Sequence, residues 1–281
     1  MIHIWDTKIP QLTGNEIRKT YIYLPDSYET EEDQYYPVLY MFDGHNLFFD
    51  SVATYGKSWG LKEYMDYTET QLIIVATECN HNPDHGRLKE YSPYSFMAPD
   101  IGMIYGKGHI YMDWLVNELK PAIDKSFRTI PDREYTMIAG SSMGGLMSLF
   151  AITTYNHVFS KAACLSPSIW FNTSKLKRMI NRAKMAPDTV IYMDYGSEEM
   201  ANHHNMRSRF AHTVCDLILQ GVNVQSRVIP YGEHSEASWE RQIPFFMETL
   251  LYGIYPEEEF LEDIEKYHED IKSSDSFDED E

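Results

Sequence analysis

Long apolar runs are missing from this sequence of 281 residues. No stretch reaches the ~18 consecutive apolar residues that a membrane-spanning helix needs. The first ten residues, MIHIWDTKIP, also lack the basic segment followed by an apolar one that marks a secretory signal. We therefore expect no membrane partner and a cytoplasmic location.

Cysteine is also scarce. The chain has Cys79, Cys164 and Cys215, which are far apart and form no CxxC pair. This argues against a disulfide framework and a structural zinc site, and it fits a reducing compartment. The histidine-containing segments HNPDH (81–85) and NHHNM (202–206) lack the HExxH spacing and a clear third ligand. We expect no metal and no cofactor.

Positive charge is in short supply. The chain has 24 lysines and arginines against 43 acidic residues, a formal net charge of −19. Such a chain repels nucleic acid, so we exclude a nucleic-acid partner. Much of the negative charge lies in residues 256–281, which we expect to form an acidic, partly disordered C-terminal tail because they cannot bury enough apolar surface.

Apolar residues, by contrast, make up 43% of the chain, enough for a large core. Residues 36–44 and 71–78 are short continuous apolar runs, typical of strands covered on both faces of a parallel sheet. From residue 71 to residue 253 such runs alternate with segments of helical periodicity. The alternation predicts a single α/β domain over residues 1–255, with a mostly parallel sheet between helices.

Three segments carry more specific predictions. Residues 17–25 alternate and end in proline, which predicts an edge strand. Residues 111–127 have helical spacing with a kink expected at Pro121. Residues 79–108 show no clear periodicity, and a loop this long in a compact domain is usually functional or disordered. We interpret it as an insertion that shapes a substrate site.

The segment MIAGSSMGGLMSLF, residues 137–150, raises the first chemical question. Its centre fits G-x-S-x-G around Ser142, between an apolar strand and a helix, which is the context of a nucleophile elbow. Gly140 and Gly144 keep Cβ atoms out of a sharp turn, and the helix N-terminus favours a developing oxyanion. The alternative is a glycine-rich turn with a capping serine. The context favours Ser142 as a nucleophile.

A serine nucleophile needs a base, usually histidine. In a fold with this elbow the base follows the last strand, which we place at residues 222–232. Of the eleven histidines, two come after it, His234 and His268. His268 lies in the acidic tail, whereas His234 directly follows the strand and precedes a helix. We therefore predict His234 as the base; a surface histidine near a helix N-terminus is the alternative.

The acid that orients the base should follow the preceding strand, within TVIYMDYGSEEM (189–200). Glu199 lies three residues past Gly196 and is our first choice. Glu198 is the second choice and Asp194 the third. Two of these three carboxylates would then be simply solvated.

The oxyanion hole should use the backbone N–H of Met143 and a second N–H from the loop after an early strand, MFDGHNLFFD (41–50). Gly44 permits a tight backbone there. His45 is our first choice for the second donor, with Asn46 as the alternative. The Asn46 side chain could equally cap or close the turn.

These residues resemble the esterase D and enterochelin esterase group of α/β-hydrolases, which also includes feruloyl esterases and S-formylglutathione hydrolase. The resemblance runs from about residue 36 to residue 250 and rests on these segments, in family order: YPVLYMFDGHNLF, EYSPY, ELKPAIDKSF, MIAGSSMGGL, CLSPSIW, YGSEE and GEHSEASW. It implies the α/β-hydrolase fold and a Ser–acid–His hydrolase with Ser142, His234 and an acid at the Glu199 position. Many members have aspartate there, which keeps Glu198 open.

The resemblance also implies a substrate pocket. The segments 90–94 and 166–170 would line it, so we expect Glu90, Tyr91 and Trp170, together with Asn46, to contact substrate. Trp170 could equally be a core aromatic.

We therefore predict a serine carboxylic-ester hydrolase that forms an acyl-enzyme on a small-molecule ester, for example a short-chain acyl, aryl or sugar ester. An acyltransferase with the same nucleophile and a non-catalytic interaction protein on a hydrolase scaffold are the alternatives. A homodimer is the default expectation for its assembly.

Overall fold

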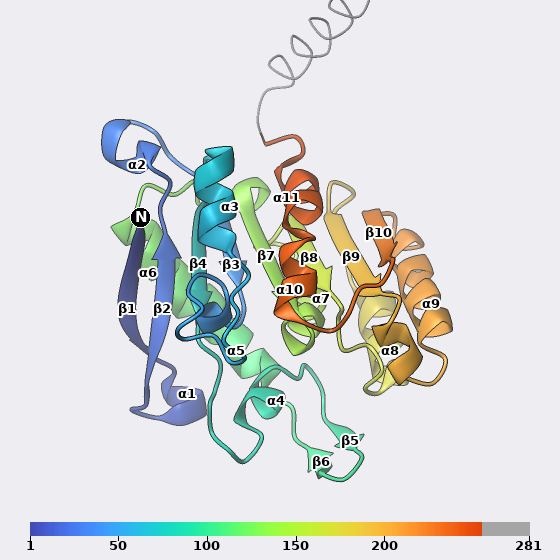
Figure 1. The fold of residues 1–281 in the computed structure, drawn as a ribbon. Coiled ribbons are helices and arrows are strands. Elements are labelled where there is room, and N and C mark those ends of the chain that lie inside the picture. Colours follow the sequence, from blue (N-terminus) through green and yellow to red (C-terminus); the bar gives the residue numbers. More distant parts are fainter. Residues whose placement is uncertain (255–281) are drawn as a thin grey trace, which may run out of the picture. The chain divides into compact units, whose positions relative to one another are not determined.

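The centre of the molecule is an eight-stranded sheet in the order β1-β2-β4-β3-β7-β8-β9-β10 (Figure 1). The computed structural model describes residues 1–254, of which Met1–Leu250 form one unit. The predicted tail, residues 256–281, lies outside the described residues. The strands are β1 (Ile2–Lys8), β2 (Ile17–Tyr23), β3 (Val38–Met41), β4 (Ile73–Thr77), β7 (Thr136–Ser141), β8 (Lys161–Leu165), β9 (Val190–Gly196) and β10 (Asn223–Ile229).

The sheet is mostly parallel. The pairs β3–β4, β3–β7, β7–β8, β8–β9 and β9–β10 run parallel, whereas β1–β2 and β2–β4 run antiparallel. Every residue of β3, β4, β7 and β8 is buried. This burial explains why these strands are continuous apolar runs in the sequence.

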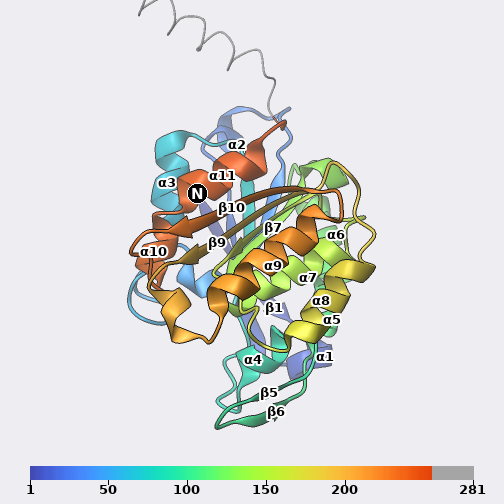
Figure 2. The same cartoon turned by 90° about the vertical axis from the view of Figure 1, so that its right-hand side faces the viewer.

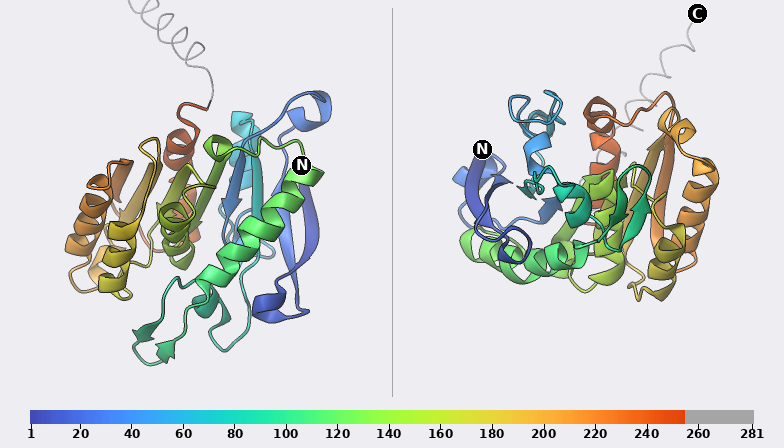
Figure 3. Two further views of the ribbon diagram at one scale, coloured as in Figure 1. Left: turned by 180° about the vertical axis from the view of Figure 1, so that it is seen from behind. Right: turned by 90° about the horizontal axis from the view of Figure 1, so that it is seen from below.

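Helices cover both faces of the sheet, as predicted (Figures 2 and 3). The helices on one face are α3 (Leu61–Thr68), α10 (Glu236–Glu240) and α11 (Ile243–Leu251), and those on the other are α5 (Gly108–Trp114), α6 (Lys120–Ser126), α7 (Met143–Thr154), α8 (Thr173–Arg182) and α9 (Met206–Ile218). Short helices α1 (Pro10–Thr13) and α2 (Ser27–Thr30) lie in connections. This is the α/β-hydrolase architecture.

The prediction of an edge strand at residues 17–25 is wrong. β2 (Ile17–Tyr23) lies between β1 and β4, and its last four residues are buried. On this side of the sheet the edge strand is β1, whose residues are all exposed or half-buried. The proline that suggested an edge, Pro25, comes after the strand has ended, so it removes no hydrogen bond from the ladder.

The helical segment predicted at residues 111–127 is divided into three parts. Helix α5 is followed by a π-helical turn, Leu115–Leu119, and then by α6. Pro121 comes directly after the π-helical turn, and the backbone keeps helical dihedral angles through Leu119 and Lys120. The change from π-helix to α-helix therefore falls just before the proline.

No described helix is long and apolar enough to cross a membrane.

The segment 79–108 is more ordered than its sequence suggests. It contains helix α4 (Gly86–Glu90) and a hairpin of β5 (Phe96–Ala98) and β6 (Gly102–Ile104). Figure 1 shows α4 and this hairpin beyond the carboxyl ends of the parallel strands. These elements are too short to produce a periodic pattern, which explains why the sequence did not reveal them.

Candidate active site

Ser142 stands between β7 and α7 in a strained conformation. Its φ of 57° and ψ of −118° lie in a region that non-glycine residues rarely adopt. The turn is held on both sides, because the Ser142 N–H donates to the Leu165 carbonyl at 2.9 Å and the Ser142 carbonyl accepts from the Ser168 N–H at 3.0 Å. The serine side chain is thereby presented at the carboxyl edge of the sheet.

The glycines around Ser142 are required by close contacts. A Cβ atom on Gly140 would lie 2.8 Å from the Gly144 carbonyl carbon, and one on Gly144 would lie 2.9 Å from the Phe42 Cβ. Neither contact leaves room for any other residue. The two glycines of the G-x-S-x-G motif are therefore required because the elbow packs closely on itself and on the loop after β3.

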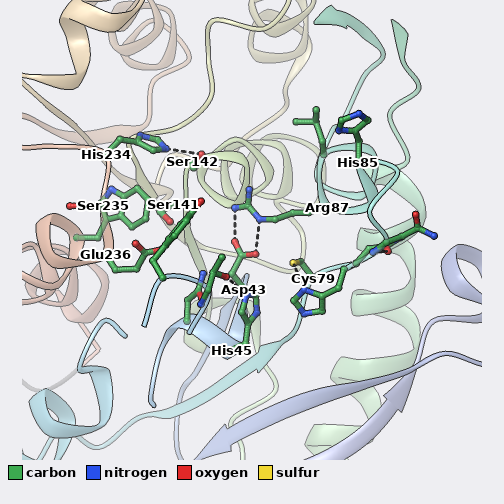
Figure 4. A pocket seen from close by; sticks show the side chains of 18 of the residues that line it. Asp43, His45, Cys79, His85, Arg87, Ser141, Ser142, His234, Ser235 and Glu236 are labelled. Carbon is green, nitrogen blue, oxygen red and sulfur yellow. Dashed lines mark hydrogen bonds and ion pairs between the residues drawn. The ribbon is translucent and has the colours of Figure 1, made fainter. Parts of the chain in front are cut away.

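Ser142, His234 and Glu199 come together from three segments that follow parallel strands. The His234 Nε2 lies 2.9 Å from the Ser142 Oγ, a contact drawn as a dashed line in Figure 4, and the His234 Nδ1 lies 2.6 Å from the Glu199 Oε2. The Glu199 side chain is only 4% exposed, whereas that of His234 is 35% exposed. A buried carboxylate thus contacts one ring nitrogen while the other nitrogen faces the nucleophile.

The structure distinguishes the three candidate acids. Glu198 is exposed, and its Oε1 accepts from the Ser197 hydroxyl. Asp194 is buried, but its carboxylate accepts from the Ser166 N–H and from the Tyr192 hydroxyl. Burial raises the pKa of Asp194 to about 7. Of the three, Glu199 is the one that contacts His234.

Two residues that sequence reasoning missed support Glu199. The Ser166 hydroxyl donates to the Glu199 Oε1 at 2.5 Å, and the Gly196 N–H donates to the same oxygen at 2.6 Å. The Trp239 Nε1–H donates to the Ser166 Oγ at 3.1 Å, and its ring packs edge-on against His234. The segments SPSIW and GEHSEASW contained both residues, but nothing in their spacing indicated this contact.

The loop after β3 lies beside the elbow. Its 3₁₀ turn, Gly44–Asn46, follows Asp43 in a left-handed conformation. The Asn46 N–H already donates to the Asp43 carbonyl at 2.8 Å, which leaves His45 as the better candidate for a free backbone donor. Met143 is the first residue of α7, where a backbone N–H has no acceptor within the helix.

A cavity of about 660 Å³ opens at Ser142 and His234. Most of the side chains that line it are of polar residue types, and its walls come from the loops after β3, β4 and β10. Its other lining residues include Asn46, Asn80, His81, Asn82, His85, Arg87 and Glu236. Arg87 donates from Nε and Nη2 to the two oxygens of Asp43, each at 2.7 Å (Figure 4). A guanidinium held in this way keeps a fixed position on the cavity wall.

The acids of this cavity wall differ in their electrostatics. Burial alone would raise the pKa of Asp43, but the Arg87 guanidinium outweighs it and holds that pKa below its usual value. Burial raises the pKa of Glu236, which has no ion-pair partner among the described residues. Arg87 and Asp43 therefore form a charged pair in the wall.

The predictions for Glu90 and Tyr91 need correction. Glu90 is 1% exposed and pairs with the Arg18 Nη1 at 2.6 Å, and Tyr91 is fully buried, with its ring packed edge-on against Phe42 and Tyr111. Neither side chain lines the cavity. Both are parts of the interior that support the segment 79–108.

Asn46 and Trp170 stay closer to their predicted places. Asn46 lines the cavity, but its Oδ1 accepts from the Thr54 N–H at 2.9 Å and so closes a turn. Trp170 is half-buried; its ring stacks on His203 and lies 6.4 Å from the His234 ring. Trp170 is thus near the base without being among the residues that line the cavity.

A family model described as "Esterase: Putative esterase" matches residues 12–250. The uncharacterized protein YbbA of Bacillus subtilis (strain 168) is 28% identical over 188 residues, 65% of this chain and 69% of that protein. A siderophore triacetylfusarinine C esterase of Aspergillus fumigatus is 24% identical over 194 residues, 62% of this chain and 64% of its own length.

Solved structures share the fold. An IroE-like serine hydrolase from Shewanella oneidensis superimposes with a TM-score of 0.67 at 18% identity, covering 89% of this chain and 78% of that one. At this identity the likeness concerns the fold.

Proposed function

Because the chain belongs to the esterase family, we propose that it hydrolyses carboxylic esters through a triad of Ser142, His234 and Glu199. One observation carries the proposal: an unbroken series of contacts joins the Ser142 Oγ to the His234 Nε2 and the His234 Nδ1 to the Glu199 carboxylate. A strained, cavity-facing serine with a base in contact and a buried acid behind it is the arrangement of an activated nucleophile.

In the proposed reaction the Ser142 Oγ attacks the ester carbonyl carbon while His234 takes the hydroxyl proton at Nε2. The imidazolium then gives this proton to the departing alkoxide oxygen, leaving an acyl-enzyme on Ser142. Water, deprotonated by His234, attacks the acyl carbon; the bond from that carbon to the Ser142 Oγ breaks, His234 returns the proton to this oxygen, and the acid is released. Glu199 keeps the Nδ1–H tautomer and stabilises the imidazolium, and its other oxygen is fixed by Ser166 and Gly196.

The negative charge that develops on the carbonyl oxygen needs donors. We assign this role to the backbone N–H groups of Met143 and His45. The first sits at the N-terminus of α7, where the helix dipole adds to its effect. The second comes from the turn that packs against the elbow through Phe42. Each such donor contributes about 3 kcal/mol to transition-state stabilisation.

We further propose that the substrate is a small, oxygen-rich ester rather than a long-chain lipid. The cavity is lined by asparagine, histidine and serine side chains, with a fixed Arg87 guanidinium that can bind a carbonyl or hydroxyl oxygen. We keep Trp170 as an aromatic contact for the acyl or alcohol group. The activity named for the Aspergillus fumigatus relative places siderophore esters first among the compounds to test.

The test is ester hydrolysis by wild type and by Ser142→Ala across a panel of p-nitrophenyl, feruloyl and siderophore esters. We expect Ser142→Ala to lower kcat by about 10⁴-fold or more. Ser208→Ala, at an exposed position of α9 away from the cavity, is the control and should keep the activity. Equal activity in Ser142→Ala and wild type would rule out the triad. Product analysis with added alcohols separates hydrolysis from acyl transfer.

A further inference from the structure

Three potential metal ligands meet in one wall of the cavity. His45 lies in the turn after β3, and Cys79 and His81 come directly after β4. A ring nitrogen of each histidine and the Cys79 Sγ all lie within 4.8 Å of one another. The His81 Nδ1 is 4.0 Å from that sulfur, and the two imidazole rings are edge-on with centroids 4.8 Å apart.

His45 supplies a second, independent observation. The residue is 5% exposed, and its Nδ1 is a buried atom with no hydrogen-bond partner among the described residues. Its Nε2 lies 3.0 Å from the Thr54 Oγ1. A buried polar atom without a partner costs free energy, so it calls for an explanation.

The two nitrogens of His45 are arranged as in a metal-bound histidine. Such a histidine usually donates its second N–H to an oxygen, which fixes the tautomer and directs the other nitrogen at the metal. Thr54 is placed to accept from Nε2, which leaves a lone pair on Nδ1. Figure 4 shows His45, Cys79 and Asp43 gathered on one side of the cavity.

We propose that His45, Cys79 and His81 bind a borderline divalent cation, with Zn²⁺ as the representative. Two imidazole nitrogens and one thiolate favour Zn²⁺ and Co²⁺ over Mg²⁺ and Ca²⁺, which prefer oxygen ligands. Ligand atoms in a tetrahedral zinc site are about 3.5 Å apart. Closing the cluster therefore needs shifts of about 1 Å, and His81, the exposed member of the three, is the side chain with most room to move.

The proposed site has an open fourth position. All three side chains line the cavity that contains Ser142, so the remaining coordination position would face that cavity and take water or an oxygen of a bound molecule. Binding needs the Cys79 thiolate, and the cation displaces the thiol proton to solvent. The sequence alone offered His81 and His85; the fold joins His81 to Cys79 and to the distant His45 instead.

Co²⁺ titration of the full chain tests the proposal, because a thiolate-bound tetrahedral Co²⁺ absorbs in the near ultraviolet and the visible. We expect saturation at one Co²⁺ per chain and loss of both bands when Zn²⁺ is added. Cys79→Ser should remove the near-ultraviolet band, whereas Cys215→Ser, which changes an exposed cysteine elsewhere, should keep it.

A histidine pair completes the test. His81→Asn should weaken Co²⁺ binding about 10- to 100-fold, and His85→Asn, in the same loop and the same cavity, should leave it unchanged. Thermal melts check that each variant is folded. A wild type without a saturable thiolate band overturns the proposal, as does a band that survives Cys79→Ser or an equal loss of affinity in both asparagine variants.

Discussion

Two buried glutamates, Glu199 and Glu90, are alike in burial and in pairing with a basic side chain, but they differ in their position relative to the cavity. Each is at most 4% exposed, and each contacts a nitrogen of a basic side chain at 2.6 Å. The partner of Glu199 is His234, whose second nitrogen faces a cavity and a serine. The partner of Glu90 is Arg18, whose side chain is 1% exposed and whose Nη2 donates to the Thr13 hydroxyl. Burial and pairing with a basic side chain therefore do not identify a catalytic acid by themselves. The two cases differ in what the basic partner contacts next, which is Ser142 at the cavity for His234 and Thr13 for Arg18.

The largest expected effect comes from Glu199→Gln. The amide can no longer stabilise the imidazolium and favours the wrong tautomer of His234, so we expect kcat to fall by about 10⁴-fold with a nearly unchanged Tm. Steady-state kinetics and a thermal melt on the same sample check both parts. Glu198→Gln, on the exposed neighbour, is the control and should behave as wild type. A similar loss in both variants would mean that Glu199 has no special role.

Glu90→Gln should show the opposite pattern. It leaves the Arg18 charge uncompensated in the interior, which we expect to lower the free energy of unfolding by about 3–5 kcal/mol. The kcat per folded molecule should stay the same, because the pair does not touch the cavity. Urea unfolding combined with active-site titration measures both quantities. A fall in kcat without loss of stability would instead mean that Glu90 contributes to substrate binding or catalysis.

Asp194 is a third buried acid, and among the described residues no cation forms an ion pair with it. Burial raises the pKa of Asp194 to about 7. Because the folded state then holds its proton up to a higher pH than the unfolded state, this group lowers stability as the pH rises from about 4 to 7, by up to ~1.4 kcal/mol per pH unit. Asp194→Asn should flatten that part of the profile, measured by urea unfolding at several pH values. If the free energy of unfolding of Asp194→Asn changes between pH 4 and 7 as steeply as that of wild type, a raised pKa of Asp194 is contradicted.

Asp43 should act in the opposite direction. Its pKa is held below the usual value by Arg87, so its contribution to stability is present above about pH 4 and is lost as the pH falls further. Asp43→Asn should therefore reduce the loss of stability on acidification below pH 4. The same unfolding series, extended to pH 2.5, tests this expectation.

The smallest effect concerns the support of Glu199. Trp239→Phe removes the N–H that donates to the Ser166 Oγ and keeps most of the ring packing on His234. We expect a loss of about 1 kcal/mol in stability and a modest drop in kcat with KM unchanged. Trp59→Phe, at a neighbouring buried tryptophan, controls for packing alone. An equal effect on kcat in both variants would mean that the Trp239 N–H has no specific role in holding Ser166 and Glu199 in place.

The sequence was informative where the chemistry is local. The elbow at Ser142 is a continuous segment whose glycines are dictated by contacts within the segment and with the adjoining loop. His234 follows from the order of strands, and Glu199 from its position after β9. The fold class followed from the alternation of buried strands and helices, and the esterase family model agrees with the resemblance.

Contacts between distant segments were not predictable in this way. Arg18 reaches Glu90 across 72 positions, and His45 approaches Cys79 from another strand end. Neither contact leaves a spacing pattern in the chain. For the same reason the resemblance placed Glu90 and Tyr91 on the substrate side, whereas their side chains point into the interior.

Ser142 is the nucleophile of the proposed triad, and fluorophosphonate labelling of the wild-type protein tests this role most directly, with the adduct located by peptide mass spectrometry. The proposed triad predicts a single phosphonylated residue, Ser142, and no adduct in Ser142→Ala. A folded wild type that takes no label, or a label that persists at another residue in Ser142→Ala, would contradict it.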